Sequence, residues 1–173
     1  IAHLQRKLAL KKRFFSNWRK IKQKIAKKHS RIARIRHAFI LQSSSEIAKN
    51  HGFIVLEALV TKNMSKSASG TKENPGTKVA QKKGLNRAIL RQGWYQFQEK
   101  LKQKAEEFGS IVTLVNPKNT SRECASCSFV SADNRKSQSH FACIQCGYED
   151  HADINAAKTI LSRGRRAYAL CAN

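Results

Sequence analysis

Four cysteines in this 173-residue chain stand at the spacing of a metal site. Cys124 and Cys127 form one C-x2-C pair, and Cys143 and Cys146 form a second after fifteen intervening residues. Two residues between cysteines let a tight turn aim both sulfurs at one ion, so two pairs supply a tetrahedron of thiolates. Because four protein ligands leave no open coordination position, we expect a structural zinc ion (Zn²⁺) here. Two disulfides, or four buried thiols, are the alternatives.

Two carboxylates could do chemistry of another kind. Glu57 interrupts the apolar run of residues 53–60, which predicts a buried strand. A carboxylate there is costly unless it is paired, binds a cation or faces the exposed side of the strand. Asp153 begins a helical pattern over residues 153–161, where the helix dipole favours a carboxylate in any case. If both converge, they could hold magnesium or manganese ions, and a pair of such ions can cleave a phosphodiester.

The elements that would position these groups follow from apolar periodicity. Residues 4–39 have helical spacing, and Ser16 is a candidate N-cap that would divide them into a short and a long antiparallel helix. We expect a flexible basic loop over residues 61–84, a long helix over 85–108 and a second strand over 110–115. The aromatic residues of the long helix are expected in the core, with a platform for base stacking as the alternative. A strand, a crossover helix and a strand predict a parallel pair, so the fold class is α/β.

The charge of the chain points to nucleic acid. Thirty-four Lys and Arg against eleven Asp and Glu give a formal net charge of +23, which favours a polyanionic partner. The dense Lys and Arg of residues 4–39 are typical of a surface that follows a phosphate backbone, with a merely solvated face as the alternative. No apolar run approaches a spanning helix and no segment resembles a signal peptide, so we expect no membrane partner. The cysteine usage favours a reducing compartment, and Cys171 receives no role.

Several sequence blocks, taken in order, resemble the C-terminal half of TnpB (OrfB), the protein of bacterial insertion sequences related to the type V CRISPR effectors. The similarity runs through essentially the whole chain. The blocks are VLEAL at residues 55–59, KNMSK at 62–66, NPKNTS at 116–121, the two cysteine pairs, and DINAA at 153–157.

This resemblance implies a RuvC-like, ribonuclease H-like nuclease domain that is interrupted by a zinc ribbon. The implied division has a basic helical hairpin at residues 1–50 and a strand–helix–strand core at 51–119. The zinc ribbon follows at 120–150, and a final helix with a basic tail occupies 151–173.

The resemblance also implies roles for the carboxylates. Three acidic residues of the family bind the catalytic Mg²⁺ or Mn²⁺ ions; Glu57 matches the second and Asp153 the third, with Asp150 as a supporting candidate. The residue after Glu57 is usually acidic in the family and is Ala58 here. The family's first catalytic Asp and its guide-binding modules lie upstream of the region that this chain matches, so we expect the chain alone to lack cleavage and to need that N-terminal part.

The implied function is that of a C-terminal fragment of an RNA-guided DNA endonuclease from a transposable element. Its partners would be DNA and a guide RNA, and its location the bacterial cytoplasm at the nucleoid. A non-catalytic zinc-ribbon module that binds nucleic acid, or a basic zinc protein of the ribosome, are the alternatives. Convergence of the Glu57 and Asp153 carboxylates to about 4–7 Å, the reach of a metal bridge, would favour the nuclease.

Overall fold

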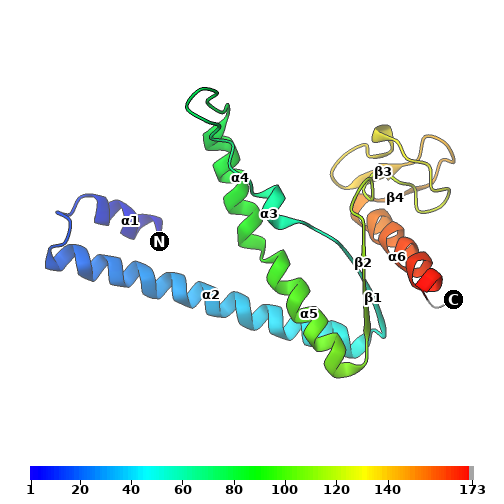
Figure 1. Ribbon diagram of the computed structural model, residues 1–173, viewed down its shortest axis with the longest axis horizontal. Coiled ribbons are helices and arrows are strands. Elements are labelled where there is room, and N and C mark those ends of the chain that lie inside the picture. The colour runs from blue at the N-terminus through cyan, green and yellow to red at the C-terminus, as the bar shows by residue number, and fades with distance from the viewer. Residues whose placement is uncertain (172–173) are drawn as a thin grey trace. The chain divides into compact units, whose positions relative to one another are not determined.

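The computed structural model describes residues 1–171, and side chains through residue 170, so the side chain of Cys171 lies outside the described residues. The chain forms two compact units, Ile1–Ser44 and Ser45–Asn173. The first contains helix α1 (Ala2–Ala9) and most of helix α2 (Ser16–Asn50) (Figure 1). The second contains the end of α2 and every later element.

The first unit is a pair of helices, as the periodicity predicts. α2 begins at Ser16 itself, and Phe14 before it adopts a left-handed conformation (φ 68°) that reverses the chain. The Phe14 ring lies 5.5 Å from that of Trp18, centroid to centroid, which stabilises the turn. Leu4 of α1 and Ile21 of α2 line the same groove, so the two helices are neighbours.

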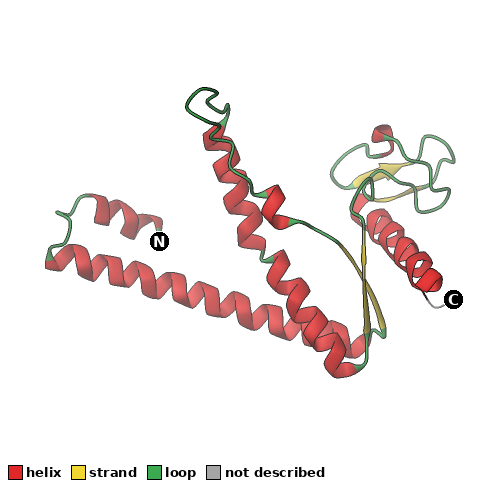
Figure 2. Ribbon diagram, viewed as in Figure 1, coloured by secondary structure: helices red, strands yellow, loops and turns green. Residues whose placement is uncertain are grey.

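The second unit is built on a parallel pair of strands. Strand β1 (Phe53–Glu57) pairs with β2 (Ile111–Val115) in a register that sets Phe53 opposite Ile111 and Glu57 opposite Val115. The predicted parallel pair is confirmed, and this sheet has two strands in the part of the chain that the structure describes. The crossover consists of helices α3 (Thr61–Met64), α4 (Val79–Gln92) and α5 (Trp94–Phe108) (Figure 2).

The crossover differs from its prediction in three respects. The expected loop over residues 61–84 contains α3 and the first turns of α4, and the Lys82 ammonium donates a 2.8 Å hydrogen bond to the carbonyl of Met64 that joins them. The expected long helix is divided at Gly93, whose left-handed φ of 73° ends α4. The aromatic side chains also divide, because Phe97 packs into the core while Trp94 is exposed.

The core of the second unit lies on both faces of this short sheet. Ala48 of α2, Ile54 of β1 and Leu101 of α5 are buried together. Helix α6 (Ala152–Cys171) also packs on β1, with the Tyr168 ring 5.3 Å from Phe53. Gly164 permits this approach, because a Cβ there would fall 2.3 Å from a methyl group of Val55. None of the described helices is long and apolar enough to cross a membrane.

Residues 120–151, here named the cysteine module, have little regular structure. Strand β3 (His140–Ala142) pairs antiparallel with β4 (Glu149–His151), and a short 3-10 helix, η1 (Ala132–Asn134), precedes them. Phe141 is fully buried beside Cys124 and Cys143. So small an apolar core favours stabilisation by a bound metal ion.

Candidate metal centres

The structure brings the four predicted cysteines together. All four sulfur atoms lie within 4.8 Å of one another, and the cysteines are free. Cys124 and Cys146 have their sulfurs 3.7 Å apart, and Cys127 and Cys143 have theirs 3.6 Å apart. These separations are too long for a disulfide bond of about 2.05 Å. They match the roughly 3.8 Å edge of a tetrahedron with zinc–sulfur distances of about 2.3 Å, so the residues fit a zinc ion.

Each cysteine pair sits on the same kind of turn. The carbonyl of Cys124 accepts a hydrogen bond from the N–H of Ser128 (2.9 Å), and that of Cys143 accepts one from the N–H of Gly147 (3.0 Å). Ser128 and Gly147 both have left-handed backbones, with φ of 63° and 71°. The small residue after each pair therefore folds the chain back beneath the sulfurs.

The neighbouring thiols of the cluster shift one another's pKa values. Burial raises the pKa of Cys143, but hydrogen bonds from the N–H groups of Cys146 and Gln145, together with neighbouring thiols, outweigh it and lower the pKa to about 7. The N–H of Phe129 lowers the pKa of Cys127, but burial and the neighbouring thiols raise it to about 12. A divalent cation would draw all four groups toward thiolate, so its affinity must fall as the pH falls.

Asn134 supports this cluster and was missed by the sequence analysis. Its side chain is fully buried, and its amide nitrogen donates to the carbonyls of Arg122 (2.9 Å) and Phe129 (3.1 Å). Its amide oxygen accepts from the N–H of Ile144 (3.1 Å), so one side chain joins the backbones of both cysteine turns. An asparagine in a polar stretch carries no sequence signal for such a role.

Glu57 is the last residue of β1 and is half-buried. Its Oε1 accepts a 2.5 Å hydrogen bond from the hydroxyl of Thr120. Within the described residues, no Lys, Arg or His side chain comes within ion-pair distance of this carboxylate, although the chain carries a net charge of +23. It lines a cavity of about 260 Å³ together with Phe97 and Ile160. A half-buried carboxylate without a basic partner is suited to bind a cation.

Asp153 lies in the first turn of α6, as predicted. Its side chain is 75% exposed, and its Oδ1 is 3.6 Å from a guanidinium nitrogen of Arg135. No described hydrogen bond or ion pair joins it to Glu57. An exposed carboxylate with one distant basic partner is free to accept a hard cation.

Helix geometry places Asp153 on the face of α6 that meets the sheet. Ile160 and Gly164 follow it by seven and eleven residues, which returns the chain to nearly the same side of a helix with 3.6 residues per turn. Gly164 lies on Val55, and Ile160 lines the cavity of Glu57. Asp153 is thus two turns, about 10 Å along the axis, from the level of Ile160.

Asp150, the supporting candidate, lies in β4 and has strong partners. Its Oδ2 accepts from the Lys158 ammonium (2.8 Å) and from the Tyr148 hydroxyl (2.7 Å). Lys158, and then Tyr148, lower the pKa of Asp150 to about 2. These contacts tie the cysteine module to α6. They account for the carboxylate without a metal, and its part in catalysis stays a prediction.

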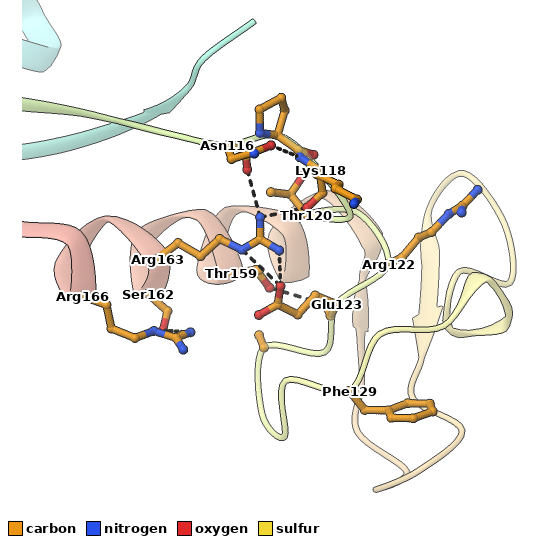
Figure 3. A network of polar contacts seen from close by, with 12 residues as sticks. Asn116, Lys118, Thr120, Arg122, Glu123, Phe129, Thr159, Ser162, Arg163 and Arg166 are labelled. Carbon is orange, nitrogen blue, oxygen red and sulfur yellow. Dashed lines mark hydrogen bonds and ion pairs between the residues drawn. The ribbon is translucent and has the colours of Figure 1, made fainter.

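The segment between β2 and the first cysteine, residues 116–123, is held by α6 (Figure 3). Arg163 donates through Nη1 to the carbonyls of Asn116 and Lys118, both at 2.9 Å, and through Nε and Nη2 to the carboxylate of Glu123. The fully buried Asn155 donates to the Glu123 carbonyl at 2.8 Å. The sequence does not predict this network, because Asn155 lies in the DINAA block, where the resemblance to the family assigns a role to Asp153 alone.

Known proteins resemble this chain in sequence and in fold. The family model "Cas12f1-like, TNB domain" matches residues 94–160, which include β2, all four cysteines and Asp153. InsQ of Escherichia coli (strain K12), whose name describes an RNA-guided DNA endonuclease, is 46% identical over 169 residues, which are 98% of this chain and 42% of InsQ. The resemblance to TnpB is confirmed. This chain spans less than half the length of InsQ.

Two Cas12f1 proteins extend the comparison. The CRISPR-associated endodeoxyribonuclease Cas12f1 of Sulfoacidibacillus thermotolerans is 44% identical over 71 residues, which are 40% of this chain and 17% of that protein. One chain of the solved Cas12f1–sgRNA–target DNA complex is 23% identical to this chain, with a TM-score of 0.53. The match covers 92% of this chain and 41% of that one. At that identity the likeness concerns the fold alone.

Proposed function

We propose that this chain is the C-terminal part of a TnpB-like, RNA-guided DNA endonuclease of a bacterial transposable element. Glu57 and Asp153 would hold the divalent ions, Mg²⁺ or Mn²⁺, of its nuclease site. The observation that carries the proposal is Glu57, a half-buried carboxylate without a basic partner in a chain of net charge +23. In this reading β1, β2 and α6 belong to a RuvC-like fold, and the cysteine module is its zinc ribbon.

The residues present fit such ions. Glu57 and Asp153 offer hard carboxylate oxygens, the ligands that Mg²⁺ and Mn²⁺ prefer. Bound ions of this kind stabilise the attacking and the leaving oxygen of a phosphodiester. The chain's own contribution is position: the end of β1 presents Glu57, and the first turn of α6 presents Asp153 on the face that meets the sheet. The cysteine ion is structural in this proposal and touches no substrate.

The first unit supports nucleic acid as the partner. Residues 1–44 contain fourteen Lys and Arg and no Asp or Glu, so no acidic side chain of this unit offsets them. Lys20, Lys24, Lys27 and Arg31 are all exposed on α2. Such a surface binds a phosphate backbone whatever the base sequence. In the proposed protein a guide RNA would read the DNA sequence by pairing while these residues hold the backbone, at the bacterial nucleoid.

The test is cleavage by a chimera in which this chain replaces the matching 42% of InsQ. With a guide RNA and Mg²⁺, the chimera should cut matched duplex DNA. Glu57→Gln and Asp153→Asn should each reduce cutting to the level seen without divalent metal. Asp133→Asn is the matched control, because Asp133 is an exposed aspartate of η1. Cleavage that survives both carboxylate substitutions would place the active site elsewhere.

A non-catalytic module that binds nucleic acid is the second candidate. It is favoured by the ion pair between Asp153 and Arg135, which gives this carboxylate a structural partner. In that case the chimera would bind DNA and guide RNA, with a zinc-loaded cysteine module, and would cut nothing even with its full set of carboxylates.

A further inference from the structure

We propose that Thr120 is a positioning residue for the proposed metal site, and that Arg163 sets its hydroxyl against Glu57 by clamping both ends of segment 116–123. The inference rests on the proposed function of Glu57. It adds a residue that contacts no ion itself and determines how the carboxylate is presented.

The contact at Glu57 is short and directional. The Thr120 Oγ1 lies 2.5 Å from Oε1 of Glu57 and 3.0 Å from the carbonyl oxygen of Pro117. A threonine hydroxyl has one proton, and the shorter contact to a charged acceptor is the stronger. The hydroxyl therefore donates its hydrogen bond to Glu57 and fixes Oε1, which leaves Oε2 available to a cation. Thr120 is buried, with 4% of its surface exposed, so water competes little for this bond.

The clamp explains how Thr120 is held there. The guanidinium of Arg163 binds the carbonyls of Asn116 and Lys118, which precede Thr120. The same guanidinium binds the carboxylate of Glu123, which follows it. Only a planar, forked donor such as arginine can serve these acceptors together. A rigid segment on either side leaves Thr120 with a single orientation relative to the end of β1.

The far end of the same segment is tied to the turn that carries Asp153. Asn155, two residues after Asp153, binds the carbonyl of Glu123 and also accepts from the N–H of Ala125. Segment 116–123 thus contacts Glu57 directly and contacts the first turn of α6 near Asp153. We infer that it sets the spacing of the two carboxylates as well as the orientation of Glu57.

Manganese binding to the zinc-loaded chain tests this inference without any cleavage. The readout is paramagnetic broadening of the Glu57 side-chain NMR signals as Mn²⁺ is added. Thr120→Val should raise the midpoint concentration about 10- to 100-fold, the usual effect of losing an outer-shell partner. Thr120→Ser, which keeps the hydroxyl, should stay near wild type. Thr113→Val is the matched control, since Thr113 sits in β2 opposite Val55.

Further measurements distinguish a variant that fails to fold from one that has lost the positioning role. Zinc content and thermal unfolding identify a Thr120→Val protein that fails to fold, and Arg163→Lys then serves as a second variant that should raise the same midpoint. Equal midpoints for Thr120→Val and Thr113→Val, or no broadening at Glu57 in the wild-type chain, would overturn the inference. If Glu57→Gln abolishes cleavage by the chimera while Thr120→Val has the same Mn²⁺ midpoint as Thr113→Val, the proposed function stands and the positioning role falls.

Discussion

At the scale of single residues, the two cysteine turns differ at the position that needs a positive φ. Ser128 holds it in the first turn and Gly147 in the second. A left-handed backbone costs an L-residue with a side chain about 1–2 kcal/mol, whereas it costs glycine little. A Cβ at Gly147 would meet nothing within 4 Å, so the difference is one of backbone conformation and not of packing.

Substitutions at these two positions should therefore change stability in opposite directions. Ser128→Gly should raise the free energy of unfolding of the zinc-loaded chain, and Gly147→Ala should lower it, each by about 1 kcal/mol. Denaturant unfolding at a fixed zinc concentration measures both. Changes of the same sign in the two variants would show that these turns do not depend on φ.

Residue types that act through short-range geometry could be predicted from the sequence, and those that act through tertiary contacts could not. The cysteine spacing itself determines a turn, so the four ligands are predictable. Asn134 and Thr120 have roles that depend on which backbone segments fold against them, and their neighbours in sequence reveal nothing of this. Glu57 is intermediate: its anomaly in an apolar run is visible, but its bond to Thr120 is not.

At the scale of elements, α6 joins the cysteine module to the sheet by contacts of different kinds. Near its start, Lys158 binds Asp150 of β4. The pKa of Asp150 lies below its usual value of 3.8, at about 2, so the folded state favours the charged carboxylate. Its stabilising effect is complete above about pH 4 and is lost as the pH falls through about 2.

Asp150→Asn should accordingly lower the Tm of the zinc-loaded chain by the same amount at every pH between about 5 and 8. The difference from wild type should shrink below about pH 4, because the wild-type carboxyl then begins to gain a proton. Thermal unfolding at matched pH and matched zinc content measures it, with Asp133→Asn as the control for loss of an exposed charge. A difference that grows on acidification would contradict the assigned pKa.

The elements themselves were predicted in kind but not in extent. The parallel pair follows from two apolar runs joined by a helical stretch, and it is confirmed. The break at Gly93 was missed because the apolar period continues across it. α3 was missed because the carbonyls of Met64 and Ser65, at its end, accept hydrogen bonds from Lys82 and Asn86 on α4. Local pattern identifies which segments are helical, whereas boundaries depend on such distant partners.

At the scale of the whole molecule, the charge is unevenly distributed. The first unit has no acidic residue, whereas the basic residues of α5 have local partners. Lys102 pairs with Glu99 at 3.3 Å, and Lys104 pairs with Glu107 at 2.6 Å. If the first unit binds the phosphate backbone of DNA, each phosphate that it contacts releases counterions.

The salt dependence of DNA binding distinguishes these two sets of lysines. Replacing Lys24, Lys27 and Lys28 of α2 by Ala should weaken binding equally on unrelated sequences. It should also reduce the slope of log K against log salt by up to about 0.9 for each lost contact. The matched triple substitution of Lys100, Lys102 and Lys104 should leave the slope nearly unchanged. Equal losses from both triple variants would mean that net charge, and not the surface of α2, determines binding.

The anomalous signal of Mn²⁺ in crystals of the zinc-loaded chain would show directly whether Glu57 and Asp153 share a metal site. We predict a manganese peak within about 2.1–2.4 Å of an oxygen of Glu57 and of an oxygen of Asp153, with Asp153 released from Arg135. We also predict a zinc peak among the four cysteine sulfurs. Manganese that binds only one of the two carboxylates, with Asp153 still paired to Arg135, would contradict a shared nuclease site.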